Sequence, residues 1–332
     1  GARGAAKRMS TRASGFASTR AGMEIRKPRA LNSRSVLMPF APASPAEFAK
    51  VVAGAEELRN LGFQVADATP LAAEGYFAGS ESGRRSEFLG EIEREDVNAL
   101  VAVRGGYGSN YLLDNLEVRQ PGAPKVILGY SDLTSLQVYL WQRYAWIGFY
   151  APMLAAGLDA GAGVAKGYDR ESLLAAVGKT DGGWTLKLRG ETLVEGEAEG
   201  RVLGGCLTLV ETTLGTPWEL DTRGSILLLE DRGMKPWQVD RSLMHLKQAG
   251  KFDGVQGIVL GEFPECDAPG TGHATVRDVC VRILGALRVP IAFGAAVGHT
   301  PRPMLTVPLG VRARLRASGE GELEILEPAV VL

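Results

Sequence analysis

Cysteine and histidine are scarce in this chain, with three residues of each among 332. The cysteines, Cys206, Cys266 and Cys280, are odd in number and form no C-x-x-C pair, which argues against a disulfide framework and structural zinc. No cluster of His, Cys and acidic residues has metal-ligand spacing, so we expect neither a metal nor a cofactor. Such sparse cysteines are typical of a reducing compartment, and we expect a cytoplasmic protein.

Long apolar runs are also lacking. No segment reaches the roughly 18 uninterrupted apolar residues that a membrane-spanning helix requires, so no membrane partner is expected. The net charge is −1, and nine of the 37 Lys and Arg residues lie within residues 1–35, beside a single acid. A compact acidic body with a basic leader is not the profile of a nucleic-acid-binding protein. We expect residues 1–35 to be a mostly disordered leader.

Helical and strand patterns alternate over residues 36–155. Ser44-Pro45-Ala46-Glu47 is read as a capping box with proline at the first helical position, and a second helix is predicted over 86–94. Buried-type strands are predicted at 99–103 and 126–128. This alternation indicates an α/β domain with a parallel sheet covered on both faces, in which ligands lie beyond the carboxyl ends of the strands.

The pattern changes after a glycine-rich linker, predicted at 156–175. Short alternating segments follow, and the tail from residue 304 alternates as antiparallel strands do. We therefore expect residues 176–332 to form a β-rich α+β domain. Its predicted elements are strands at 225–229, 255–260 and 290–297, and a helix over 239–248.

Ser131 lies where the apolar run 126–128 meets a predicted helix over 133–140. A serine at such a corner can be displayed as a nucleophile, with free backbone N–H groups beside it to hold an oxyanion. Gly129 supplies the first glycine of a G-x-S-x-G elbow, but Leu133 replaces the second. The alternative is a plain helix cap, because Ser is a preferred N-cap and Asp132 suits the first turn.

A nucleophilic serine needs a base, and the chain offers three histidines. His245 lies inside an amphipathic helical pattern and His273 in a glycine-rich loop, whereas His299 ends an apolar run and precedes a proline-stiffened segment. His299 is therefore the favoured base. Glu230 and Asp231 end the buried strand 225–229, and strand alternation sends their side chains to opposite faces, so one of them can enter a cleft.

Other chemistries find less support. The chain has no G-x-x-x-x-G-K-[ST] and no H-E-x-x-H, and no S-x-x-K begins at Ser131. Cys206 could be a nucleophile, but no histidine is near it in sequence. We interpret it as a small buried residue beside two glycines.

The chain resembles the LD-carboxypeptidase (muramoyltetrapeptide carboxypeptidase) family of serine peptidases, which also includes the peptidases that confer immunity to microcin C. The resemblance spans residue 36 to the end and keeps the family's order. It is carried by Ala41-Pro42-Ala43-Ser44-Pro45, Arg104-Gly105-Gly106-Tyr107-Gly108, Gly129-Tyr130-Ser131-Asp132-Leu133-Thr134, Gly204-Gly205, Leu228-Leu229-Glu230-Asp231, Asp240-Arg241 and Gly298-His299.

The resemblance implies specific roles. Ser131 becomes the nucleophile, His299 the general base and Glu230 the acid that orients it, with an oxyanion hole formed by the backbone N–H groups of Asp132 and Gly106. It also implies a flavodoxin-like N-terminal domain, a β-rich C-terminal domain and a homodimer. For substrate binding we expect the loop containing Arg104, Gly105 and Tyr107 to contribute, because its N–H groups can hold a terminal carboxylate.

Two positions depart from the family pattern. Tyr150-Ala151-Pro152 stands where many members have His-Gly-Pro, and Cys206 stands where an asparagine is common.

The expected activity is that of a serine carboxypeptidase, which removes terminal D-alanine from the L-centre of a diamino acid in a small peptide or muropeptide during peptidoglycan recycling. One alternative substrate is a peptidyl or aminoacyl nucleotide, with Trp184, Trp218 and Trp237 as possible platforms for the base. The other alternative is a non-catalytic binding module on the same scaffold.

Overall fold

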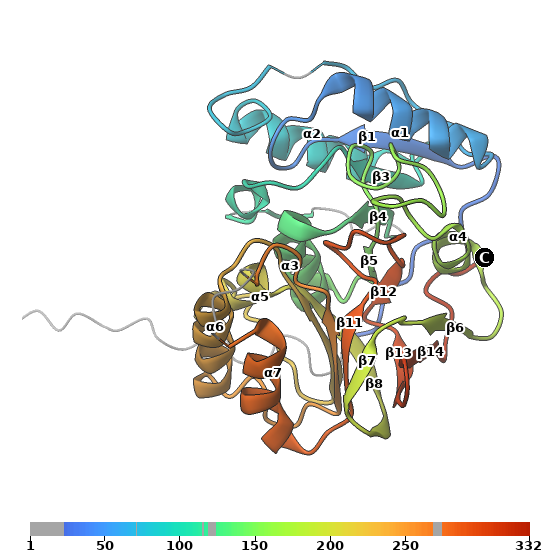
Figure 1. Ribbon diagram of the computed structural model, residues 1–332. Coiled ribbons are helices and arrows are strands. Elements are labelled where there is room, and N and C mark those ends of the chain that lie inside the picture. Colours follow the sequence, from blue (N-terminus) through green and yellow to red (C-terminus); the bar gives the residue numbers. More distant parts are fainter. Residues whose placement is uncertain (1–22, 71, 115, 119–123, 268–273) are drawn as a thin grey trace, which may run out of the picture.

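Two β-sheets organise the chain, one above the other in Figure 1. The computed structural model describes residues 23–332 apart from 71, 115, 119–123 and 268–273. The first half of the chain supplies most of a six-stranded sheet, and the second half supplies an eight-stranded sheet. The expected combination of a parallel-sheet α/β part and a β-rich C-terminal part is confirmed.

The N-terminal sheet contains β1 (Val36–Phe40), β2 (Gln64–Val65), β3 (Ala99–Ala102), β4 (Val126–Gly129), β5 (Gly148–Tyr150) and β12 (Val307–Leu309). Its order is β2-β1-β3-β4-β5-β12, with the first five strands parallel. The order 2-1-3-4-5 is that of flavodoxin-like sheets. Every residue of β3 and β4 is buried, as strands covered on both faces require.

Helices pack on both faces of this sheet. They are α1 (Phe48–Asn60), α2 (Glu81–Glu93) and α3 (Thr134–Tyr144). Leu58 of α1 belongs to the same apolar cluster as Val101, whereas Phe88 of α2 and Leu136 of α3 cluster with Leu100. Because successive strand residues point to opposite faces, these two clusters lie on opposite sides of the sheet.

The C-terminal sheet contains β6 (Trp184–Lys187), β7 (Glu191–Val194), β8 (Gly196–Cys206), β9 (Ser225–Glu230), β10 (Gly257–Gly261), β11 (Ile291–Ala295), β13 (Arg312–Ala317) and β14 (Glu322–Ile325). Its centre, β8-β9-β10-β11, is parallel, and its outer strands are antiparallel. The helices of this part of the chain are α4 (Arg170–Gly178), α5 (Leu207–Glu211), α6 (Pro236–Gln248) and α7 (Val276–Leu284). Figure 1 shows α6 and α7 side by side next to the sheet.

Two helix starts differ from the sequence prediction. Ser44 caps no helix: α1 begins at Phe48 without a side-chain cap, and the Ser44 hydroxyl instead accepts a hydrogen bond from the N–H of Tyr107 at 3.1 Å. The capping-box prediction was therefore wrong, because a loop remote in sequence competes for the serine oxygen. The second helix, predicted from residue 86, begins at Glu81 behind the N-cap Ser80.

Segments distant in sequence tie the two sheets together. β12 leaves the C-terminal part of the chain and pairs antiparallel with β5. Residues 23–35, expected to lie in a disordered leader, join the body: the N–H of Arg26 donates to the carbonyl of Ala145 at 2.9 Å, and that of Leu31 to Val177 at 2.8 Å. Residues 1–22 lie outside the described residues. Such backbone pairing depends on neighbours remote in sequence and leaves no periodic pattern.

The predicted linker is also partly helical, since α4 begins within it. Among the helices that the structure describes, none is long and apolar enough to cross a membrane.

Candidate active site

Ser131 occupies a strained turn at the carboxyl end of β4. It begins a short 3-10 helix, η2 (Ser131–Leu133), with φ of +62°, a conformation that costs a non-glycine residue on the order of 1 kcal/mol. Leu133 folds back over Gly129, where a Cβ would lie 2.1 Å from the leucine side chain. Gly105 is also closely packed, because its Cβ would approach that of Ser131 to 3.0 Å. The corner is therefore an elbow that displays its serine, although the second glycine of the motif is replaced.

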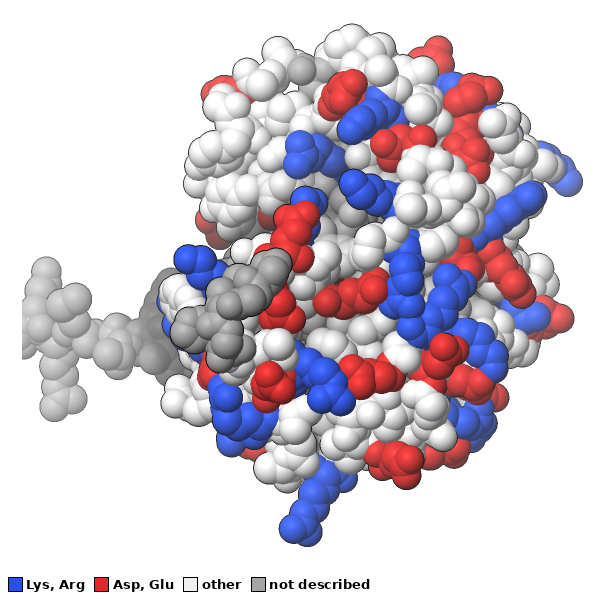
Figure 2. Space-filling model, in the orientation of Figure 1, with Lys and Arg blue, Asp and Glu red and all other residues white. Residues whose placement is uncertain are grey.

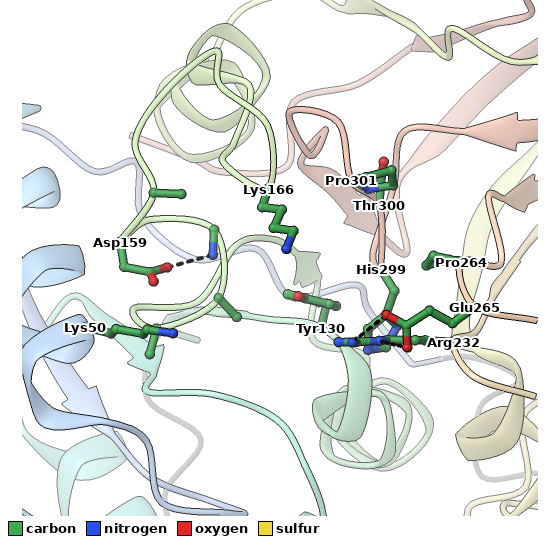
Figure 3. Close-up of a pocket in the computed structure, with 14 residues that line it drawn as sticks. Lys50, Tyr130, Asp159, Lys166, Arg232, Pro264, Glu265, His299, Thr300 and Pro301 are labelled. Atoms are coloured by element: carbon green, nitrogen blue, oxygen red, sulfur yellow. Dashed lines mark hydrogen bonds and ion pairs between the residues drawn. The ribbon is translucent and has the colours of Figure 1, made fainter.

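Ser131 and His299 line one cavity of about 350 Å³. Arg104, Gly105 and Gly106, which follow β3, line it as well. The cavity thus lies at the carboxyl ends of β3 and β4, where parallel sheets bind their ligands. An adjoining recess of about 400 Å³, drawn in Figure 3, shares six lining residues with this cavity: Lys50, Tyr130, Ala155, Ala156, Arg232 and His299.

Glu230 and His299 form a buried pair at the edge of the C-terminal sheet. The Glu230 carboxylate ends β9 and is fully buried, and its Oε2 accepts hydrogen bonds from the backbone N–H of His299 at 2.9 Å and from His299 Nδ1 at 2.8 Å. Gly298, with φ of +61°, makes this approach possible, since a Cβ there would lie 2.4 Å from the carboxyl carbon of Glu230. The contact directs His299 Nε2 away from the acid.

Asp231 points elsewhere. Its carboxylate accepts hydrogen bonds from the N–H and the hydroxyl of Thr208, at 2.9 and 2.7 Å. The two neighbouring acids therefore separate as strand alternation predicts, and Glu230 is the one that contacts His299.

The surroundings of His299 favour the protonated imidazole. Burial alone lowers the pKa of His299, but the charge of Glu230, its hydrogen bond and the charge of Asp231 outweigh that effect, so the pKa lies above its ordinary value of 6.5. An imidazole with a raised pKa is a stronger base once it is deprotonated.

Ser131 and His299 face the same cavity, but the structure records no hydrogen bond between the Ser131 hydroxyl and the imidazole. Catalytic hydrogen bonds are often long or misaligned until a substrate is bound, and the shared cavity keeps Ser131 and His299 as the candidate pair.

The glycine loop after β3 is fixed to the serine turn. Asp132 Oδ2 accepts from the N–H of Ser109 at 2.8 Å, and the Ser109 hydroxyl donates to the carbonyl of Asp132 at 2.6 Å. Gly106 has φ of +94°, and a Cβ there would lie 2.4 Å from the hydroxyl of Ser44. Within this described loop and turn, no protein acceptor is recorded for the N–H groups of Gly106 and Asp132. They are the two donors to which the family resemblance assigns the oxyanion hole, and that role stays a prediction.

The predicted substrate-binding residues divide into two groups. Arg104 and Gly105 line the cavity, but Tyr107 does not. The ring of Tyr107 packs instead against those of Tyr76, Phe77 and Tyr111. The prediction for Tyr107 rested on its place in the loop, and the side chain turns toward an aromatic cluster that sequence order does not reveal.

Sequence reasoning gave no catalytic or binding role to several residues at or beside the cavity, and it noted Tyr150 only as a departure from the family pattern. Lys50 and Arg232 line the cavity, and Tyr150 joins Ser131 to Glu230. Arg84 is buried below the glycine loop and donates to the carbonyls of Pro42 at 3.1 Å and Gly79 at 2.7 Å. Arg232 could have been suspected from its place beside the two acids. Arg84 could not, since a buried guanidinium in a surface-like helix has no sequence signal.

Two other candidates, His245 and Cys206, do not line the cavity. His245 on α6 is largely exposed and contacts Glu211, and His273 lies outside the described residues. Cys206 is buried, and burial, with the nearby charge of Asp231, raises the pKa of its thiol well above 9.0. A thiol held protonated in this way is inert, as expected for a packing role.

A displayed serine beside unbonded backbone N–H groups, facing a carboxylate-bound imidazole, is the arrangement of serine-type hydrolases. The chain belongs to the LD-carboxypeptidase family. The family's N-terminal domain matches residues 39–151, and its C-terminal domain matches residues 199–315. The protein is thus a serine-type carboxypeptidase hydrolase.

Individual relatives agree with this assignment. A Bacillus subtilis (strain 168) protein named "Probable murein peptide carboxypeptidase" is 32% identical over 88% of this chain and 92% of its own length. The solved structure of MccF in complex with glutamyl sulfamoyl guanosine is similar with a TM-score of 0.82 and 25% identity, over 92% of this chain and 99% of that one. Muramoyltetrapeptide carboxypeptidase from Oxalobacter formigenes shares the fold, with a TM-score of 0.78 and 24% identity over 89% of this chain and 99% of that chain.

Proposed function

We propose that this carboxypeptidase removes terminal D-alanine from the L-centre of a diamino acid in muropeptides, with Ser131, His299 and Glu230 as a catalytic triad. The observation that carries the proposal is the Glu230–His299 contact of 2.8 Å beside a cavity that Ser131 also lines. The names of the murein peptide relatives support the substrate class.

In the proposed first step, Ser131 Oγ attacks the carbonyl carbon of the scissile amide and its proton passes to His299 Nε2. The N–H groups of Gly106 and Asp132 hold the negative oxygen of the tetrahedral intermediate. Collapse breaks the C–N bond, and His299 gives its proton to the leaving amine of D-alanine. An ester between Ser131 and the shortened peptide remains.

The second step reverses these roles with water. His299 takes a proton from a water molecule, whose oxygen attacks the ester carbon. The tetrahedral intermediate collapses, the bond to Ser131 Oγ breaks, and the serine recovers its proton from the imidazolium. Glu230 stays ionised throughout and holds the imidazole in one tautomer and orientation.

Recognition of the terminal carboxylate fits the charges around the cavity. Arg104, Lys50 and Arg232 line it. Arg232 is bonded to Glu265 at 2.7 Å, and Lys50 lies 3.6 Å from Glu47, whereas Arg104 makes only a long contact of 3.4 Å to the carbonyl of Pro45. Arg104 therefore has most of its donors available, and we propose it as the main cation for the substrate carboxylate.

Cleavage of an aminoacyl nucleotide is the second candidate, and the similarity to MccF with glutamyl sulfamoyl guanosine favours it. The tryptophan platforms considered for the base do not support it, because no tryptophan lines the cavity or its adjoining recess. Trp218 packs against Tyr139, and Trp237 contacts Arg241 on α6. The peptide substrate is therefore preferred.

Three compounds test the choice: a tetrapeptide ending in D-alanine, the same peptide as its C-terminal amide, and an aminoacyl sulfamoyl adenylate, each followed by mass spectrometry. The proposal expects rapid cleavage of the free acid and slow cleavage of the amide. Cleavage of the adenylate alone would replace the recycling role by an immunity-type role. No cleavage of any compound would favour a non-catalytic binding module.

A homodimer and a cytoplasmic location are further proposals, which rest on the family resemblance and on the sparse cysteines. Light scattering of the purified protein tests the first, since a monomer at micromolar concentration contradicts it. Fractionation of cells that produce the full-length protein tests the second.

A further inference from the structure

Tyr150 lies between the two halves of the proposed triad. It ends β5, where it pairs with Gly129 of β4 on one side and Val307 of β12 on the other. Its side chain is fully buried and packs where Gly205 leaves room, since a Cβ on that glycine would lie 3.0 Å from the tyrosine ring. The ring position is therefore fixed by both sheets.

The hydroxyl of Tyr150 makes two hydrogen bonds. It donates to Glu230 Oε1 at 2.5 Å and accepts from the backbone N–H of Ser131 at 3.3 Å. Glu230 thus has a donor on each oxygen, with Tyr150 on Oε1 and His299 on Oε2. A single oxygen atom connects the backbone of the proposed nucleophile to the proposed acid.

We propose that Tyr150 is a positioning residue that joins the two halves of the triad; this inference rests on the proposed function. By accepting the N–H of Ser131, the hydroxyl stabilises the turn that holds this serine at φ of +62°. It also withdraws this N–H from the oxyanion, which leaves the N–H groups of Gly106 and Asp132 as the donors there.

The second consequence concerns the imidazole. A donor on Oε1 draws negative charge away from Oε2, so the bond from His299 Nδ1 is weaker than it would be to an otherwise bare carboxylate. Removing the Tyr150 hydroxyl therefore strengthens the hold of Glu230 on the imidazolium, and His299 keeps its proton to a higher pH.

Several other titratable and charged groups surround the Glu230–His299 pair, and two of them, Tyr130 and Cys206, also interact with Tyr150. The ring of His299 contacts Tyr130, and its charge interacts with those of Asp231, Arg232 and Glu265. Cys206 lies close to Tyr150 and Glu230. The cavity or its recess is also lined by Lys50, Lys166 and Arg104. The hydroxyl of Tyr150 itself stays protonated, because burial and the charge of Glu230 raise its pKa well above 10.0.

The test is the pH dependence of labelling by a fluorophosphonate probe, which reports the reactivity of the serine without assuming a substrate. Tyr150→Phe removes only the hydroxyl. We expect the labelling rate to fall roughly 10- to 100-fold, and the acidic limb of its pH profile to move up by about 0.5 to 1 pH unit.

Tyr168→Phe is the matched control. Tyr168 is also fully buried and also donates to a carboxylate, Glu57 Oε1 at 2.7 Å, but it lines neither the cavity nor its recess. This variant should lose some thermal stability and keep the rate and pH profile of the wild type. A Tyr150→Phe profile that is unshifted, or lowered equally at every pH, overturns the proposal.

Site-specific 3,5-difluorotyrosine at position 150 gives a second test should Tyr150→Phe fail to fold. It keeps the hydroxyl and is a stronger donor, so the acidic limb should move to lower pH; an unchanged limb overturns the proposal. The proposed function fails separately: if wild type and Ser131→Ala react equally with the probe, the serine mechanism itself is wrong.

Discussion

The two sheets hold their parts of the site by different means. The N-terminal sheet presents a strained serine and backbone N–H groups, which are positioned by glycines that leave no room for a Cβ and by the Asp132–Ser109 bonds. The C-terminal sheet presents Glu230 and His299, which are positioned by the hydrogen bonds that the Glu230 carboxylate accepts from the backbone N–H and from the imidazole of His299. The nucleophile and the groups that hold the oxyanion must be placed accurately, and the backbone does this. The group that carries the proton needs an adjusted pKa, and a buried carboxylate beside it provides this.

Neither sheet carries all the groups that the proposed reaction needs. Among the described strands, those of the N-terminal sheet contain no histidine, and Cys206, the nucleophile candidate at the end of β8, is held protonated. β12 and Tyr150 cross between the halves, and they fix the distance that the chemistry requires. Substitutions on each side should therefore fail in different ways.

The largest effect is expected from the N-terminal half. Ser131→Ala removes the nucleophile and should lower kcat by roughly 10⁴-fold or more, with little change in thermal stability. Steady-state kinetics on the tetrapeptide measures the loss. Ser135→Ala is the matched control, because the Ser135 hydroxyl in α3 is buried without a hydrogen-bond partner. Comparable loss in both variants would show that the elbow is merely structural.

The acid of the C-terminal half comes next. Glu230→Gln should lower kcat by about 10³- to 10⁴-fold, because a neutral amide no longer stabilises the imidazolium or fixes its tautomer. Asp231→Asn is the control on the neighbouring residue. It disturbs bonds to Thr208 and should cost stability more than activity. If the two variants ranked the other way, the assignment of the acid would be overturned.

Arg104→Gln should have a smaller effect that is confined to binding. Losing one charge-assisted contact to the substrate carboxylate should raise KM about 5- to 20-fold and leave kcat nearly unchanged. The C-terminal amide of the peptide provides the comparison, since it lacks the charge and should be insensitive to this substitution. Equal effects on acid and amide would show that Arg104 does not bind the carboxylate.

The pH dependence of kcat/KM tests the C-terminal part of the site, which carries His299. The pKa of His299 is raised above 6.5 by Glu230, and the base must be neutral, so kcat/KM should increase with pH through a midpoint above 6.5. Stability has the opposite sign. A raised folded-state pKa stabilises the fold below pH about 6.5, and this contribution is lost as the pH rises through the folded-state pKa. Urea unfolding of wild type and His299→Gln at pH 5.5 and 9 should differ more at the lower pH.

Chelation should have no effect. Among the described residues, no group of three or more His, Cys, Asp or Glu side chains could hold a metal ion. Dialysis against EDTA should leave the rate of tetrapeptide cleavage unchanged. Loss of activity that zinc alone restores would contradict the serine mechanism.

Much of the fold could be predicted from local patterns. The apolar runs of β3, β4 and β9 indicated buried parallel strands, and the corner at Ser131 indicated a displayed side chain. Alternation along β9 separated Glu230 from Asp231 before any contact was known. These features depend on the periodicity of apolar residues and on neighbours close in sequence, so they can be predicted from the sequence.

Long-range choices could not be predicted in the same way. Ser44 was read as a helix cap, but it bonds to the loop at Tyr107. Residues 23–35 were read as leader, but their backbone pairs with residues near 145 and 177. In each case the local signal was real, and a partner remote in sequence competed for the same polar group or backbone.

The sequence by itself determined the alternation of strands and helices, the class of chemistry and the candidate serine, histidine and acid. Tertiary structure decided that Arg104 reaches the cavity while Tyr107 turns away, and that Tyr150 joins Ser131 to Glu230. The physical reason is distance along the chain. Periodicity and turn chemistry act over a few residues, whereas a hydrogen bond between positions 80 residues apart exists only once the two sheets have packed together.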